Sequence, residues 1–241
     1  MPASVQPQPF PSNGVLSENL DLTKTELRRL IGRERAPAYS YIVKTVAIDR
    51  ATLCFEQHGS APNFQGGFLT LCTCKHQMRS SLDIEQWKGK WIVGFTSRCR
   101  HQGRHWLFFL TRVADAYESQ SDLWHNLPAV VRKSKSAQKH FLGDLFRPRG
   151  MIEGEDRFKA QNYFAPSRHS HRRNSCDNGW HNDIDYGYSD RYGRPSLLVG
   201  EPQLTFLWEK PLMFFDEDHC RNFKKWESIT ELIPHLKCEA S

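Results

Sequence analysis

The sequence lacks any long apolar segment. Apolar residues make up 39% of the 241 residues, and no run of them approaches the ~18 that a membrane-spanning helix needs. The opening stretch MPASVQPQPFPSNG has neither the charged start nor the apolar core of a secretion signal. These absences predict a soluble, cytoplasmic protein without a membrane partner.

A disulfide framework is also missing. The chain has 7 cysteines, an odd number, and they are scattered between Cys54 and Cys238 without the regular spacing of paired cysteines. We therefore expect reduced thiols. The Walker, G-x-G-x-x-G and G-x-S-x-G motifs are absent as well, so nothing in the sequence names a cofactor.

A modest excess of positive charge is present instead. The formal net charge is +6, which permits a nucleotide or DNA partner without requiring one. Aromatic residues reach 12%, so Trp and Phe should fill much of the core.

The chain divides by composition into four parts. Residues 1–20, rich in Pro, Ser, Gln and Asn, predict a disordered tail. In residues 21–38, Thr23 and Glu26 form a capping-box pattern that begins a short helix. Residues 39–216 form the main domain, and residues 217–241 predict an amphipathic helix.

Strand patterns dominate the main domain. Residues 88–97 and 104–117 read as two strands that form a hairpin, and further strands are predicted at 40–50, 67–73 and 195–208. We predict an α/β (α+β) fold: a mixed, partly closed β-sheet or small barrel with peripheral helices. Residues 144–195, which have few aliphatic side chains, would form a long functional loop.

The segment CTCKH places thiols and cations at the end of a predicted strand. Cys72, Cys74 and His76 alternate, so on a strand they share a face and could begin a zinc site, although no second Cys pair follows. We therefore predict no metal. Cys72 fits a buried small residue. Cys74 is a candidate catalytic thiol, because the cations of Lys75 and Arg79 favour a thiolate, and these cations could instead hold a phosphate or form a solvated rim.

Two clusters in the long loop could also carry chemistry. His181 with Asp183 could be a general base, a metal ligand or a surface feature. The basic run from Arg168 to Arg173 is typical of a phosphate-contacting loop. Trp91 is better explained as a core residue than as a stacking platform.

Several of these stretches, in order, resemble the second of the nucleotide modification associated domain families. APNFQGGFLTLCTCKHQMR matches its loop-and-strand pattern, with His76 where the family usually has Pro, and GKWIVGFTS matches its next strand. Later Asn-Tyr and His-Asp pairs also correspond. The matching site positions are Asn63, Cys74, Lys75, Arg79, Trp91, Ser97, Asn162, Tyr163, His181 and Asp183.

The resemblance, which spans residues 40–215, implies a role in pathways that make or handle modified DNA bases. It implies a pocket in which Lys75 and Arg79 hold phosphate and Cys74 lies near the base. Asn63, Asn162 and Tyr163 would read or stack on that base, and His181 with Asp183 would close the site. A weaker architectural similarity to PUA-like barrels, including the EVE and ASCH groups, implies the same class of ligand.

The sequence is therefore consistent with three functions. The first is a nucleotide- or base-binding protein associated with DNA modification. The second is an enzyme that modifies a nucleobase or nucleotide with Cys74 or with the His181 and Asp183 pair. The third is a non-catalytic scaffold. The sequence does not distinguish a free nucleotide from a polymer.

Overall fold

The computed structural model describes residues 6–98, 103–136, 144–166, 179–185, 193–220 and 222–238. The chain forms two compact units. No helix in these described ranges is long and apolar enough to cross a membrane. Unit 1 comprises Met1–Pro9, His58–Trp87 and Asp115–Val199, and unit 2 comprises Phe10–Gln57, Lys88–Ala114 and Gly200–Ser241.

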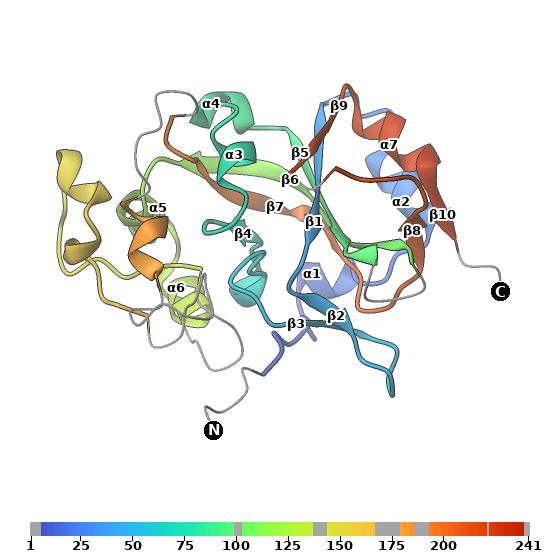
Figure 1. Ribbon diagram of the computed structural model, residues 1–241, viewed down its shortest axis with the longest axis horizontal. Coiled ribbons are helices and arrows are strands. Elements are labelled where there is room, and N and C mark those ends of the chain that lie inside the picture. Colours follow the sequence, from blue (N-terminus) through green and yellow to red (C-terminus); the bar gives the residue numbers. More distant parts are fainter. Residues whose placement is uncertain are drawn as a thin grey trace. The chain divides into compact units, whose positions relative to one another are not determined.

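Unit 2 is built on a mixed sheet in the order β10-β8-β6-β5-β1-β9. β1 runs parallel to β5, and the other neighbours along this path are antiparallel. Figure 1 shows β1 lying beside β5 and β9. The predicted mixed α+β fold is thus confirmed, while the likeness to PUA barrels stays a prediction. The strands are β1 (Ala38–Val43), β5 (Trp91–Thr96), β6 (His105–Tyr117), β8 (Met213–Phe215), β9 (Lys224–Trp226) and β10 (Leu236–Cys238).

The predicted hairpin and the aromatic core are confirmed in this sheet. β5 and β6 pair antiparallel, and the ring of Phe109 packs edge-on against Tyr41 at 5.9 Å between centroids. Trp91 is 1% exposed, and its ring stacks on Phe206 at 6.4 Å. These contacts give Trp91 a place in the core of unit 2.

Gly94 in β5 shows why a glycine stands inside a buried strand. A Cβ atom at this position would lie 2.1 Å from the ring of Phe109 and 3.0 Å from Val43 Cγ2. Gly94→Ala is therefore expected to destabilise the protein by about 1–3 kcal/mol through overpacking, measured by urea unfolding. Gly150→Ala is the control, because nothing lies within 4 Å of a Cβ there, and equal stability of the two variants would contradict this account.

The chain ends of unit 2 depart in part from the sequence pattern. The capping box predicted at Thr23 and Glu26 is present and begins α2 (Lys24–Ile31). Within the expected tail, α1 (Val15–Glu18) forms and buries Leu16. The expected C-terminal helix is divided: β9 comes first and pairs with β1, followed by α7 (Ile229–His235) and β10. Pairing with β1 gives the backbone of β9 hydrogen bonds that helix periodicity does not reveal.

Other strands also differ from their expected lengths. The predicted strand 40–50 is broken by a turn into β1 and β2 (Val46–Ile48), and β2 pairs with β3 (Phe55–Gln57). β7 (Leu197–Leu207) runs through both units. Its first residues, in unit 1, pair with β4 (Thr70–Leu71), which is much shorter than the strand expected at 67–73.

Unit 1 consists mainly of short helices and turns around β4. Its core includes Cys72, Leu123, Val131, Leu145 and Val199. The described parts of the predicted long loop contribute short 3-10 turns rather than regular structure. The helical elements of unit 1 are η1 (Gln65–Gly67), α3 (His76–Arg79), α4 (Ile84–Trp87), α5 (Gln120–Asn126), α6 (Ala129–Ser136), η3 (Gly154–Phe158), η4 (Ala160–Asn162) and η5 (Trp180–Asp183).

Candidate functional site

The end of β4 is held by one buried carboxylate. Asp144 is 0% exposed. It accepts hydrogen bonds from the Thr70 hydroxyl at 2.8 Å and from the backbone N–H groups of Cys72 at 3.0 Å and Thr73 at 3.2 Å. Burial is the largest effect on this group and raises the pKa of Asp144, against the action of its hydrogen bonds. Asp144 therefore fixes the backbone from which the CTCKH segment departs.

A buried lysine completes this frame. Lys135 Nζ donates to the carbonyl oxygens of Asn63 at 2.8 Å and Phe68 at 2.6 Å. Burial lowers the pKa of Lys135 to about 8, and the charge of Asp144 acts in the opposite direction. Asn63 also exchanges backbone hydrogen bonds with Thr70 at 2.9 and 2.8 Å. Asn63, which was predicted to contact a base, is thus fully buried beside β4.

The two thiols of the motif have different environments. Cys72 is 0% exposed, and burial, followed by the charge of Asp144, raises its pKa well above the ordinary value. It is a protonated core residue, as the sequence pattern suggested. Cys74 is only partly buried, and its Sγ lies 3.9 Å from the carbonyl oxygen of Ala61.

Lys75 makes the turn from the strand end into α3. Its backbone is left-handed, with φ 60° and ψ 46°, a conformation that non-glycine residues adopt rarely and at a cost of about 1–2 kcal/mol. Such local strain concentrates at functional sites. The turn places Cys74 and His76 on either side of a partly buried lysine.

Arg79 lies at the end of α3 and is 0% exposed. Its Nε donates to the carbonyl of Cys74 at 2.7 Å, and its Nη1 donates to the carbonyl of Ser196 at 2.6 Å. Its own carbonyl accepts from Trp87 Nε1 at 2.9 Å. The guanidinium thus joins the strand end to the segment before β7. The sequence pattern suggested that this same group contacts a phosphate.

The structure brings His76 and Asp183 together. His76 Nε2 lies 3.2 Å from Asp183 Oδ1, and the two side chains are 18% and 0% exposed. Asp183 comes from η5, which also carries His181, and the ring of His181 contacts Trp180 at 6.5 Å between centroids. The sequence indicated Asp183 but not its partner His76. The available signal was His76 itself, a titratable residue where the family usually has Pro.

Tyr163 and Asn162 are held by protein groups. Tyr163 is 1% exposed; its hydroxyl donates to the carbonyl of Arg157 at 2.6 Å and accepts from the N–H of Ser121 at 3.2 Å. Burial raises the pKa of Tyr163 to about 12, so this phenol stays neutral. Asn162 Nδ2 donates to the carbonyl of Asp156 at 2.9 Å.

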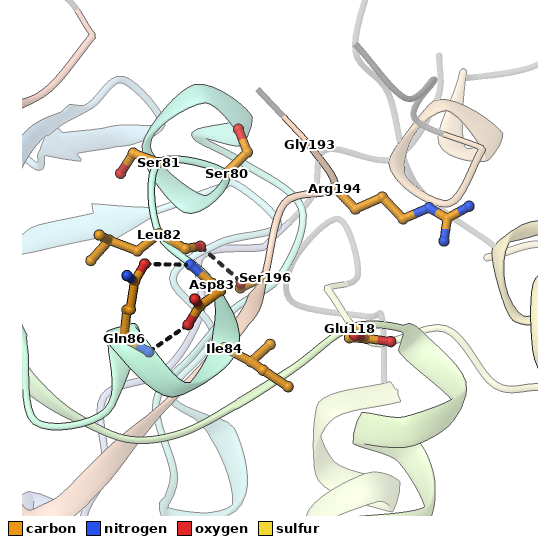
Figure 2. A pocket seen from close by; sticks show the side chains of 10 residues that line it. All are labelled: Ser80, Ser81, Leu82, Asp83, Ile84, Gln86, Glu118, Gly193, Arg194 and Ser196. Atoms are coloured by element: carbon orange, nitrogen blue, oxygen red, sulfur yellow. Dashed lines mark hydrogen bonds between the residues drawn. The ribbon is translucent and has the colours of Figure 1, made fainter. Parts of the chain in front are cut away.

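Unit 1 has a cavity directly after α3. Its volume is about 390 Å³, and Figure 2 shows Asp83 and Gln86 in a reciprocal cap, with hydrogen bonds of 3.1 and 2.7 Å, along one side. A second, smaller cavity shares Glu118 and Arg194 with the first and is lined by Asp183. The residues that line the first cavity are Ser80, Ser81, Leu82, Asp83, Ile84, Gln86, Glu118, Gly193, Arg194 and Ser196.

The remaining predictions fall elsewhere. Trp91 and Ser97 belong to unit 2. The basic run from Arg168 to Arg173 lies outside the described residues. Within the described ranges, no group of three or more His, Cys, Asp or Glu side chains is arranged to hold a metal ion.

One family model matches part of the chain. Residues 38–150 match the family described as nucleotide modification associated domain 2. The match confirms the resemblance drawn from the loop, strand and GKWIVGFTS stretches, and it indicates involvement in nucleotide modification. His76 lies inside the matched segment and Asp183 beyond it. The comparisons with curated proteins and with solved structures found no match.

Proposed function

We propose that unit 1 binds a nucleotide or nucleobase and that His76, oriented by Asp183, transfers a proton to or from it. The His76–Asp183 pair carries this proposal. A carboxylate without solvent exposure, 3.2 Å from an imidazole nitrogen, stabilises the protonated form of the ring and favours the orientation that faces it.

The cavity after α3 is the proposed place for the ligand. Its volume of about 390 Å³ lies within the ~300–1,000 Å³ typical of small-molecule sites. Leu82 and Ile84 supply apolar surface for a base, while Gln86 and Glu118 supply polar edges. Ser80, which lines the cavity, lies one helical turn after His76, and its hydroxyl donates to the backbone carbonyl of His76 at 2.8 Å.

Lys75 and Cys74 have supporting roles in this proposal. Lys75 lies at the strained turn, where its ammonium can contact a phosphate. Cys74, two residues before His76 and only partly buried, is the candidate nucleophile of an alternative, covalent route. The family match over residues 38–150 supports a nucleotide or DNA ligand for both routes.

Titration calorimetry with the deoxynucleoside monophosphates tests the binding site. Ser80→Phe, which adds a ring at the cavity wall, is expected to weaken binding about tenfold or more, equivalent to 1.4 kcal/mol. Gln77→Phe is the matched control, since Gln77 is exposed on the same helix. Absence of nucleotide binding at low salt, or equal affinity of the two variants, would contradict the proposal.

A further inference from the structure

A short two-stranded ribbon lies on the surface of unit 1. Pro148 and Tyr163 form an antiparallel bridge. On one side of it the N–H of Phe164 donates to the carbonyl of Arg147 at 2.9 Å, and on the other the N–H of Arg149 donates to the carbonyl of Asn162 at 2.9 Å. We call residues 147–149 and 162–164 the ribbon.

Side chains alternate across the ribbon, as extended backbone requires. Pro148 and Tyr163 at its centre are buried, whereas Arg147, Arg149 and Phe164 on the opposite face are exposed. Phe164 is 43% exposed, which is unusual for a large aromatic side chain. The outer face therefore presents one aromatic ring and two cations.

The two cations lie over the ring. The guanidinium carbons are 5.2 Å (Arg147) and 4.8 Å (Arg149) from the centroid of Phe164. Arg149 is also held by a hydrogen bond of 3.1 Å from Nε to the carbonyl of Tyr163. Among the described residues, no carboxylate forms an ion pair with either arginine, whereas Arg157 pairs with Asp122 at 2.8 Å and Arg194 with Glu155 at 2.6 Å.

The inner face of the ribbon anchors its backbone. Tyr163 is anchored by its hydroxyl to the carbonyl of Arg157 and to the N–H of Ser121. A ligand would therefore meet an ordered backbone and would need to rearrange only the exposed side chains.

We propose that the ribbon binds single-stranded nucleic acid, with a base stacked against Phe164 and the flanking phosphates held by Arg147 and Arg149. An exposed ring beside cations without acidic partners suits this ligand, because every base has a π-face and every linkage an anion. A single strand is favoured over a duplex, whose bases are already stacked on each other. The proposal rests on the ribbon alone and does not depend on ligand binding in the cavity.

Fluorescence anisotropy with a labelled single strand of about 12 nucleotides, within the size range of such sites, tests the proposal. Phe164→Ala is expected to weaken binding about 5- to 150-fold, the equivalent of the ~1–3 kcal/mol of base–aromatic stacking. Met151→Ala is its control, because Met151 is 81% exposed and lies outside the ribbon. The strand is tested as DNA and as RNA.

The arginines are tested by salt dependence. In Arg147→Gln/Arg149→Gln, the slope of log K against log salt should fall by about 1.4, which is ~0.7 for each lost phosphate contact. Arg33→Gln/Arg35→Gln removes the same charge from exposed positions in unit 2 and should leave the slope nearly unchanged. An equal change of slope in the two double variants would show that the effect depends only on net charge, and it would overturn the proposal.

Two further outcomes would also overturn it: tighter binding of a duplex of the same sequence, or binding of anionic phospholipid vesicles without binding of single strands. Nucleoside monophosphate affinity, measured on the ribbon variants, separates the two proposals. It should be unchanged if the cavity and the ribbon are distinct sites. Loss of monophosphate binding with Phe164→Ala would assign the nucleotide to the ribbon and remove it from the cavity.

Discussion

Asp144→Ala is expected to destabilise the protein by about 3–5 kcal/mol, the cost of removing a buried, hydrogen-bonded carboxylate and leaving a buried ammonium without its nearby counter-charge. The substitution leaves the Thr70 hydroxyl and the N–H groups of Cys72 and Thr73 without their acceptor. It also removes the negative charge that favours the buried ammonium of Lys135. The free energy of unfolding of native proteins is only about 5–15 kcal/mol, so this one substitution is expected to remove a large part of it.

Urea unfolding followed by tryptophan fluorescence measures the loss. Glu153→Ala is the control, because Glu153 is exposed in the same unit. If Asp144→Ala does not fold, Asp144→Asn gives a second test, since it keeps the side-chain shape and loses the charge. Stability of Asp144→Asn equal to that of the control would show that the carboxylate does not hold the end of β4.

Lys135 supplies an independent signature in the same experiment. Its pKa is about 8 in the folded protein, against an ordinary 10.5, so the unfolded chain binds more protons between these values. Stability of the wild type should therefore rise with pH across this window. Lys135→Met should lose that rise, and it should partly rescue Asp144→Ala because it removes the ammonium that is left without a counter-charge.

Local patterns in the sequence predicted the elements that depend on near neighbours. The capping box of α2 and the hairpin of β5 and β6 follow from residues a few positions apart. The C-terminal segment did not follow, because β9 gains its hydrogen bonds from β1, far away in the chain. A segment with helical periodicity can therefore form a strand when it pairs with the edge of a sheet.

The candidate site depended even more on distant contacts. Asp144 accepts hydrogen bonds from Thr70, Cys72 and Thr73, which lie more than 70 positions away in the sequence. No motif spacing predicts contacts over this separation. Asn63 and Arg79 were predicted to contact a ligand because of their motif positions. In the structure, Asn63 pairs with Thr70 through backbone hydrogen bonds, and Arg79 donates to the carbonyl of Cys74. Polar residues in a motif can thus serve to hold its backbone, and only their partners show which role they have.

Neighbouring aromatic residues illustrate the same limit. The sequence indicated Tyr163 and passed over Phe164, although the ribbon buries the first and exposes the second. Because side chains alternate along a strand, only one of the two can face the core. The two short strands contain too few residues for the sequence alone to show which one it is.

His76→Gln and Asp183→Asn are expected to lower turnover of a nucleotide substrate by about 10²–10⁴-fold, the range of general acid–base catalysis. His76→Gln removes the group that exchanges the proton. Asp183→Asn keeps the shape of a side chain that is 0% exposed but no longer stabilises the imidazolium. Affinity for the nucleotide should change little in either variant, because the cavity walls are intact, so the loss should appear in kcat rather than in KM.

Mass spectrometry of nucleosides from the DNA of cells with and without the protein provides the assay before the substrate is known. A nucleoside mass that depends on the wild-type protein should disappear with both variants and persist with His181→Gln, since the Asp183 carboxylate lies 3.2 Å from the imidazole of His76. Loss with His181→Gln and retention with His76→Gln would instead restore the pairing expected from sequence. Cys74→Ala then separates the two routes: loss of the product assigns a thiol nucleophile, whereas retention leaves His76 to act on the substrate or on water directly.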